Sequence, residues 1–340
     1  MAMASRGPFE RWLYPTAQGL YCEPGRFFID PVRPVERAVI SHAHADHARG
    51  GHGSVLATPE TVALMKARLG PRSAQTFNAH PCGVPLDVGD VRLTLHPAGH
   101  ILGSAQVAIE YAGARSVVSG DYKRQADPTT APFELVRCDL FVTEATFGLP
   151  VFRHGASERE IGRLLASLEA FPERAHLIGV YSLGKCQRVI ALLRAAGYER
   201  TIYLHAALKN MCDVYSTLGV DLGSLAVVGD RDRRAIAGEI VLAPPGELGG
   251  RWSRRLGDPV TALASGWMRV RARARQHGVE LPLVISDHAD WSELVQTIAE
   301  TGAEEIWVTH GREEGLVRQI ELMGRRGRAL ALLGREEEAE

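Results

Sequence analysis

The sequence predicts a mixed α/β protein built from two parts. Strands and helices alternate in the middle of the chain, which is typical of a parallel sheet. The first 150 residues consist mainly of short strands separated by turns, and after residue 266 strands return with two helices between them. We therefore expect one domain formed by residues 1–150 and 267–340, and a second domain, 151–266, inserted into it.

Composition sets the class of protein. The chain has 340 residues, of which 45% are hydrophobic and 23% charged, so it can bury a sizeable core and is not disordered. A net charge of −1 gives no general sign of a nucleic-acid partner, so any such partner must be recognised by local clusters. No apolar run is long enough for a membrane span, and the first residues lack the apolar core of a secretory signal. We expect no membrane partner.

The number and spacing of the cysteines indicate the redox compartment. Five are scattered along the chain without a C-x-x-C pair, which excludes a disulfide framework or a cysteine-rich zinc module. This usage favours a reducing compartment. We expect a cytoplasmic protein.

The predicted elements follow from hydrophobic patterns bounded by turn residues. In the first part, strands are predicted at 26–29, 38–40, 91–95, 105–111, 116–118 and 140–142, and a helix at 59–69. In the middle, helices are predicted at 157–169, 185–194 and 208–218, and strands or apolar runs at 176–181, 201–204, 240–242 and 260–264. In the last part, strands are predicted at 283–285, 306–309 and 330–332, and helices at 291–301 and 314–324. Ser157 and Glu160 have the spacing of a capping box.

The strongest functional signal follows the strand predicted at 38–40. The segment SHAHADH (41–47) places three imidazoles and a carboxylate within six residues: His42, His44, Asp46 and His47. A loop leading from a strand into a helix can direct these groups at two adjacent ions, whereas a regular strand or helix would splay them apart. Imidazole and carboxylate are ligands of zinc, and of manganese or iron as the share of carboxylates rises.

Two more candidate ligands follow strand ends in the same part. They are His100 in PAGHILGS (97–104) and Asp121 in VVSGD (117–121). Each alone is weak evidence, since a histidine near glycines or a Gly-Asp pair is usually structural. Together with the first cluster they complete a set for two divalent ions, zinc or manganese, in which Asp121 bridges both and leaves a position for water.

The order H-x-H-x-D-H, then His100, then Asp121 resembles the metallo-β-lactamase superfamily. Asp30, at the end of FFID (27–30), matches the aspartate that orients the histidine loop in that superfamily. Three later segments resemble the β-CASP nuclease branch: TEATFG (143–148) resembles its acidic motif A, SDHAD (286–290) its motif B, and THG (309–311) its motif C. The short length and the segment ASGWMRVR (264–271) are most similar to the bacterial DNA-ligase-associated exonuclease group.

This resemblance implies an αββα sandwich with an inserted α/β β-CASP cap domain and an active site in the cleft between them. One metal ion would be held by His42, His44, His100 and Asp121, and the other by Asp46, His47, Asp121 and His310. The catalytic residues would be Asp46, His288 and Glu144: His288 would contact the scissile phosphate or protonate the leaving oxygen, and Glu144 would orient it. Two cations that offset the charge of a phosphodiester transition state fit this chemistry.

Candidate substrate-binding residues lie in the middle and last parts. Ser182 and Lys185 flank a predicted turn between a strand and a helix, where backbone N–H groups and an ammonium could bind an anion. Ser265 and Gly266 follow a strand in the same way, although a plain capped turn explains both pairs equally well. Arginines alternate at Arg269, Arg271, Arg273 and Arg275, and as a strand they would share one face that could follow a phosphate backbone. A further cluster is formed by Arg231, Arg233 and Arg234.

We expect a two-metal nuclease that hydrolyses DNA, and by resemblance an exonuclease in DNA repair acting on single-stranded DNA or a free end, with DNA ligase and helicase as functional partners. An RNA-processing ribonuclease is the alternative, because a histidine at motif C is common in RNA-cleaving members. A small-molecule metallo-hydrolase would not explain the inserted region, and a non-catalytic nucleic-acid-binding scaffold would not need the complete ligand set.

Overall fold

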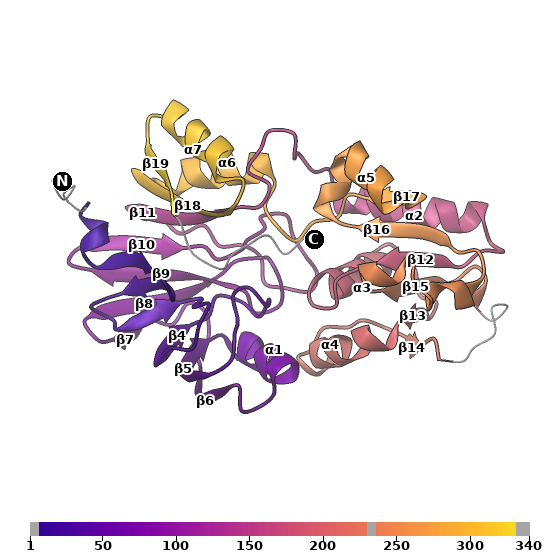
Figure 1. Cartoon of the computed structure of the whole chain (residues 1–340), viewed down its shortest axis with the longest axis horizontal. Coiled ribbons are helices and arrows are strands. Elements are labelled where there is room, and N and C mark those ends of the chain that lie inside the picture. Colours follow the sequence, from indigo (N-terminus) through magenta and orange to yellow (C-terminus); the bar gives the residue numbers. More distant parts are fainter. Residues whose placement is uncertain (1–6, 230–235, 331–340) are drawn as a thin grey trace. The chain divides into compact units, whose positions relative to one another are not determined.

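The computed structural model describes residues 7–229 and 236–330, which form two compact units (Figure 1). Unit 1 comprises 7–126, Thr130–Pro150 and 288–330, and unit 2 comprises Asp127–Thr129 and Val151–Asp287. The sequence places the second boundary near residue 266, whereas unit 2 continues to Asp287 because one more strand joins its sheet. The arginines at 231, 233 and 234 and part of the strand predicted at 330–332 lie outside the described residues.

Unit 1 contains two sheets in its described residues. The first has the order β1-β2-β3-β4-β5-β6, antiparallel from β1 to β3 and parallel from β3 to β6. Its strands are β1 (Leu13–Thr16), β2 (Gly19–Cys22), β3 (Phe27–Ile29), β4 (Arg37–Val39), β5 (His52–Ala57) and β6 (Ala74–Ala79). The second sheet has the order β19-β18-β11-β10-β9-β8-β7. Its strands are β7 (Leu86–Val88), β8 (Val91–Pro97), β9 (Ala105–Tyr111), β10 (Ala114–Val118), β11 (Leu140–Ala145), β18 (Glu305–Gly311) and β19 (Arg326–Ala329).

Two hydrophobic cores give unit 1 its layers. One joins the facing sides of the two sheets, with Leu20 and Val39 from the first sheet against Leu95 and Val107 from the second. The other lies between the second sheet and the helices α6 (Trp291–Thr301) and α7 (Glu313–Leu322). Helix α1 (Pro59–Leu69) packs on β6 of the first sheet, so the layers run helix, sheet, sheet, helix. A short 3₁₀ helix, η1 (Phe9–Arg11), precedes β1.

Unit 2 is built on one parallel sheet with the order β14-β13-β15-β12-β16-β17. Its strands are β12 (His176–Gly179), β13 (Ile202–Leu204), β14 (Leu225–Val227), β15 (Ile240–Ala243), β16 (Val260–Ala264) and β17 (Leu281–Leu283). Its helices are α2 (Ser157–Ala170), α3 (Lys185–Ala195), α4 (Ala206–Thr217) and α5 (Arg271–His277), with 3₁₀ helices η3 (Pro245–Glu247), η4 (Ser253–Leu256) and η5 (Gly266–Arg269). The central strands β12 and β15 are buried along their whole length.

The predicted mixed α/β class and the parallel sheet of the middle part are confirmed. Helices bounded by strong signals were predicted to the residue: Thr58 caps α1 ahead of a proline, and Asp290 and Glu293 form a capping box at α6. The capping box predicted at Ser157 is wrong. Ser157 is already inside α2, and the Glu160 carboxylate accepts from the backbone N–H of Val284 instead.

The strand predicted from the alternating arginines is also wrong. Arg269 ends η5, and Arg271–His277 form α5. An alternation of arginine with small residues does not specify a strand when both faces are largely solvent-exposed, because arginine and alanine are good helix formers. The strands β1, β2, β5, β6, β7, β14 and β19 were not predicted, since they are short or carry glycine and polar residues that weaken the alternating pattern. β19 ends at Ala329, just before the strand predicted at 330–332.

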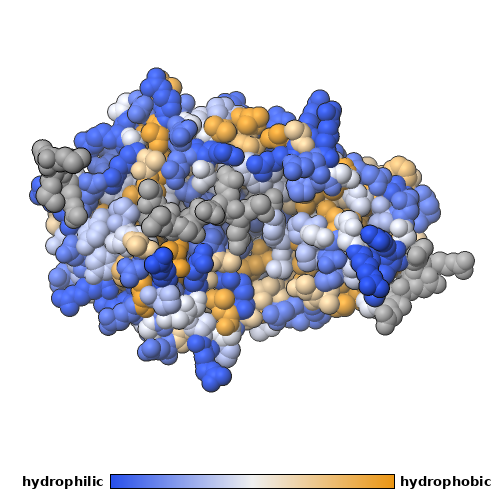
Figure 2. All heavy atoms as spheres, in the orientation of Figure 1, coloured by the Kyte–Doolittle hydropathy of each residue, from blue (hydrophilic) through white to orange (hydrophobic). Residues whose placement is uncertain are grey.

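The surface shows mixed polarity. On the face drawn in Figure 2, hydrophilic residues dominate and the hydrophobic ones form small separate patches. The large hydrophobic side chains that are exposed, such as Val151 and Leu322, lie in separate segments of the chain. In the described part of the chain, no helix combines the length and the apolar character that a bilayer span requires.

Candidate metal centre

A buried aspartate anchors the histidine loop of unit 1. Strands β3 and β4 are parallel neighbours, so Asp30 after β3 and Ser41 after β4 meet at the same edge of the sheet. The Asp30 carboxylate accepts from the Ser41 backbone N–H (2.7 Å) and hydroxyl (2.6 Å), and its Oδ2 lies 2.8 Å from His47 Nδ1. These contacts hold the start and the end of the segment 41–47 together.

The same contacts determine which ring nitrogens are protonated. His47 Nδ1 donates to Asp30, so His47 Nε2 is left to face other groups. The Ser41 hydroxyl donates to Asp30, and it must therefore accept from His42 Nδ1, which lies 3.0 Å away. His42 and His47 thus both present Nε2 as a ligand atom. Ser41 was not among the predicted site residues, although it opens the SHAHADH motif.

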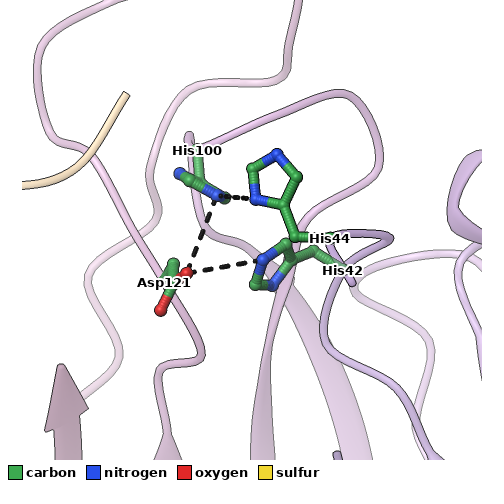
Figure 3. A group of neighbouring side chains, drawn as sticks. All are labelled: His42, His44, His100 and Asp121. Atoms are coloured by element: carbon green, nitrogen blue, oxygen red, sulfur yellow. Dashed lines mark hydrogen bonds and ion pairs between the residues drawn. The ribbon is translucent and has the colours of Figure 1, made fainter. Parts of the chain in front are cut away.

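The first group of candidate ligands comprises His42, His44, His100 and Asp121, which point toward one another in Figure 3. Asp121 Oδ2 lies 3.4 Å from His42 Nε2 and 3.8 Å from His100 Nε2, and His100 Nε2 lies 3.0 Å from His44 Nδ1. His100 follows β8 and Asp121 follows β10, so two strands of the second sheet complete a group begun by the loop after β4 of the first sheet.

The second group comprises Asp46, His47, Asp121 and His310. His47 Nε2 lies 3.2 Å from Asp46 Oδ2 and 3.3 Å from Asp121 Oδ2, and His310 Nε2 lies 3.8 Å from Asp46 Oδ2. Asp121 belongs to both groups, so its carboxylate is placed to bridge two neighbouring cations.

His310 reaches the second group through an irregularity in β18. Thr143 of β11 pairs with Val308 and Ala145 with Gly311, so β18 carries one more residue than β11 in this interval. His310 lies in this bulge with φ 63, a left-handed conformation that is uncommon for a residue with a side chain. A Cβ at Gly311 (φ 103) would lie 2.3 Å from the Ala145 carbonyl oxygen, so only glycine fits beside the bulge.

The donor set fits divalent metal ions. Metal–nitrogen bonds of about 2.0–2.1 Å in a tetrahedral site place neighbouring ligand atoms about 3.3 Å apart, close to the separations within both groups. His42 Nε2 and Asp121 Oδ1 are buried, and among the described residues they have no hydrogen-bond partner. Buried polar atoms normally have one. Cations held between the two groups would account for both atoms.

The electrostatics favour ligation. Burial, together with the nearby ring of His47, holds the pKa of His42 well below its usual range, so the ring is neutral and can bind a metal. Burial alone would raise the pKa of Asp121, but the neighbouring histidines, His47 first, outweigh it and hold that pKa well below its usual range. The Asp46 pKa is lowered in the same way by His47. Both carboxylates are therefore ionised at neutral pH.

A histidine–carboxylate pair lies beside these groups. His288 Nδ1 is 2.9 Å from Glu144 Oε2, and the other oxygen of Glu144 accepts from the backbone N–H of Tyr122 (2.8 Å). Asp121, Glu144 and His288 each offer a ligand atom within 4.8 Å of the others. The His288 ring also packs on the His100 ring, with centroids 4.6 Å apart. Tyr122, whose backbone orients Glu144, carries no sequence signal of its own.

A glycine permits this packing. Gly120 has φ 56, and a Cβ there would lie 2.8 Å from both side-chain atoms of Ser41. Any larger residue would therefore displace the serine that orients Asp30 and His42. The Gly-Asp pair that looks like an ordinary turn in the sequence is a close approach of two loops.

The candidate substrate-binding residues lie in unit 2. Lys185 begins α3, and its buried ammonium donates to Asp287 Oδ1 at 2.6 Å, so this charge is already balanced within the unit. The Ser182 carbonyl accepts from Gln187, and the Ser265 hydroxyl caps η5 at the Trp267 N–H. The remaining three are Gly266, which is buried, and Arg269 and Arg271, which are exposed.

No family model matches this chain, but comparison with known proteins finds relatives. The chain is 28% identical over 305 residues to a probable DNA ligase of Opitutus terrae, covering 88% of this chain and 29% of that protein. It is 28% identical over 249 residues to endoribonuclease ysh-1 of Neurospora crassa, covering 60% of this chain and 29% of that protein. It is 30% identical over 174 residues to cleavage and polyadenylation specificity factor 73 of Drosophila melanogaster, covering 48% and 24%. The chain thus spans less than a third of each of these relatives.

A solved structure shares the fold. The crystal structure of a protein of unknown function from Enterococcus faecalis superposes with a TM-score of 0.58 at 14% identity, over 88% of this chain and 80% of that one. At this identity the likeness concerns the fold alone.

Proposed function

We propose that this chain is a metal-dependent nuclease of the β-CASP branch of the metallo-β-lactamase superfamily, and that it hydrolyses DNA phosphodiester bonds as an exonuclease in DNA repair. The observation that carries the proposal is the position of Asp121, which is shared by two candidate ligand groups and adjoins the His288–Glu144 pair. The relatives named as endoribonucleases support nuclease chemistry, and the relative named as a probable DNA ligase supports DNA as the substrate.

In this proposal, His42, His44, His100 and Asp121 hold one divalent ion and Asp46, His47, Asp121 and His310 hold the other. When bound, such ions neutralise phosphate oxygens and activate water. The chain itself contributes orientation and proton transfer. Asp30 and Ser41 keep His47 and His42 in the ligating tautomers. Asp46, ionised at neutral pH, would ligate an ion and orient the attacking water by accepting a hydrogen bond from it.

His288 supplies the proton for the leaving oxygen. Glu144 accepts the Nδ1–H of His288, which fixes the ring and leaves Nε2 as the atom that exchanges a proton with the substrate. Glu144 is itself held by the Tyr122 N–H and is buried, so it cannot turn away from the ring. In this proposal Glu144 therefore positions the ring, and His288 contacts the scissile group.

RNA is the second candidate substrate, and the endoribonucleases among the relatives favour it. The deciding experiment uses one sequence as 5′- and 3′-labelled, single- and double-stranded DNA and RNA, incubated with the purified chain and Mn²⁺, Mg²⁺ or Zn²⁺. We expect cleavage of DNA that starts at an end and is abolished in Asp121→Asn. His277→Ala, an exposed histidine of α5, is the matched control and should retain activity. Preferential cleavage of RNA would replace DNA as the substrate, and no cleavage with any metal would refute the proposal.

A further inference from the structure

Unit 2 contains a hollow of about 620 Å³ that is rich in arginine. We call it the arginine hollow and define it by the charged residues that line it: Arg153, Arg159, Glu160, Arg163, Arg269 and Arg271. The metal centre plays no part in its walls, which come from the segment before α2, from α2 itself and from η5 and α5. These elements lie within unit 2, in the part labelled α2, β17 and α5 in Figure 1.

The walls of the arginine hollow are held in place by contacts within unit 2. On one side, Glu160 accepts from the Val284 N–H (3.3 Å) and Arg163 donates to the Pro282 carbonyl (3.0 Å), which ties α2 to the end of β17. On the other side, the Trp267 ring is buried at 3% exposure against the Phe152 ring, with centroids 4.9 Å apart. The helices that carry the arginines are therefore anchored before any ligand arrives.

The charge of the hollow is uncompensated. Glu160 is the single acidic residue among the described residues that line it, and it is ion-paired with Arg163. Among the residues that the structure describes, no carboxylate forms an ion pair with the other four arginines, Arg153, Arg159, Arg269 and Arg271, all of which are exposed. The whole chain has a net charge of −1, so this concentration of positive charge is local. Like charges gathered in one hollow repel one another unless an anion binds among them.

We propose that the arginine hollow binds the sugar–phosphate backbone of a single nucleic-acid strand. Guanidinium groups pair with phosphate oxygens in a bidentate manner, and several arginines from two separate segments of the lining suit successive phosphates of a strand better than one isolated phosphate. The Trp267 ring is buried, and the guanidinium carbon of Arg273 lies 3.9 Å from the centroid of that ring. Trp267 therefore offers no stacking face to a base. Contacts to phosphate alone make the binding independent of sequence. The inference rests on the proposed function for the identity of the strand.

The test measures binding in the full chain with His44→Ala as the background, so that cleavage does not interfere. Two double variants, Arg153→Gln/Arg159→Gln and Arg269→Gln/Arg271→Gln, remove one wall each. The probe is a fluorescein-labelled oligothymidylate, and its Kd is followed by anisotropy over a series of salt concentrations. We expect each double variant to weaken binding at least about tenfold and to reduce the slope of log K against log salt by about 1.4, because each phosphate contact on a single strand contributes about 0.7.

Two controls separate the hollow from general charge. Arg92→Gln/Arg137→Gln makes the same charge change at exposed arginines of unit 1 that border a hollow containing Asp87 and Glu110, and it should leave Kd and slope unchanged. Arg269→Lys/Arg271→Lys keeps the charge and should retain the salt slope while losing part of the affinity.

The inference is overturned if either Gln double variant binds like the unit 1 control, or if polyglutamate competes with the oligonucleotide equally well per charge, which would identify an acidic polypeptide as the occupant. Bis(p-nitrophenyl) phosphate, a phosphodiester too small to span the hollow, separates this inference from the proposed function. If neither this ester nor nucleic acid is cleaved but arginine-dependent binding persists, the proposed function fails and the inference stands. If the Gln double variants, made without His44→Ala, cleave oligonucleotides with unchanged kcat/KM, the inference fails and the function stands.

Discussion

Replacing Asp30 by asparagine tests the metal centre without touching a ligand. The carboxylate accepts three hydrogen bonds, from the Ser41 N–H, the Ser41 hydroxyl and His47 Nδ1. An asparagine amide has one acceptor oxygen, so one position must present N–H to a donor. If the amide nitrogen takes the Oδ1 position, the bond to the Ser41 N–H is lost. If it takes the Oδ2 position, two bonds are lost, and His47 must move its proton to Nε2, the ligand atom.

The smaller loss sets the minimum effect. One charge-assisted hydrogen bond in a fully buried site is worth about 1.5–3 kcal/mol, so Asp30→Asn should lower the free energy of unfolding by at least that amount. Loss of such a partner behind a histidine ligand typically weakens metal binding about 10–100-fold. We expect this weakening for Zn²⁺ or Mn²⁺, measured by competition with a chromogenic chelator, and the loss of stability by urea unfolding of the metal-free chain.

Asp213→Asn is the matched control, because that carboxylate is 57% exposed and, in the described part of the chain, its only ion pair is with Lys209 on the same helix. It should change neither quantity beyond about 0.5 kcal/mol. The reasoning is refuted if Asp30→Asn retains both the metal affinity and the unfolding free energy of the unmodified chain.

Four further outcomes are expected. His288→Gln should lower kcat by about 10²-fold or more with unchanged metal content by atomic emission, and an unchanged kcat would remove it from the chemistry. Gly120→Ala should lower the free energy of unfolding by about 1–3 kcal/mol in urea and reduce metal content. Gly113→Ala, which has the same sign of φ but open space around it, should lower the free energy of unfolding less. Equal losses would mean that the close approach at Gly120 is irrelevant. Chelation should lower Tm, since a ligand at about 100 times its Kd contributes about 2.7 kcal/mol, and an identical Tm with and without chelator would argue against resident ions. Burial lowers the pKa of His176 from 6.5, so below pH 6.5 the unfolded chain binds a proton that the folded chain does not. The free energy of unfolding should therefore fall with decreasing pH in that range, and it should fall less steeply in His176→Gln. Parallel curves for the two proteins would contradict this.

Predictions from the sequence succeeded where the signal is local. Helices α1 and α6 are preceded by residues whose side chains accept hydrogen bonds from the first turn, and α6 ends before Gly302 in the left-handed conformation. Their bounds are therefore determined by a few neighbouring residues. Strands β9 and β16 are apolar runs between turns, and their bounds were predicted to the residue for the same reason.

Predictions failed where a side chain's partner is distant in sequence. Glu160 has the spacing of a capping residue but bonds to Val284, and Lys185 looks like an anion ligand at the start of a helix but is paired with Asp287. The arginine run from Arg269 forms a 3₁₀ helix and α5, and these helices gather its charges with those of α2 in one hollow. Residue type and spacing carry no record of such partners.

The amino-acid sequence by itself determined the chemical character of this protein: the types of candidate ligand, their order along the chain and the alternation of strands and helices that gives a mixed α/β fold. Only the tertiary structure decided the geometry. It brought Asp121 into both ligand groups and placed His310 in the second ligand group through an extra residue in β18. It also left room at Gly120 for Ser41 to orient the histidine loop. The reason is physical: coordination requires atoms a few ångströms apart, and the separation of residues from different strands is set by sheet register and core packing, which local sequence does not encode.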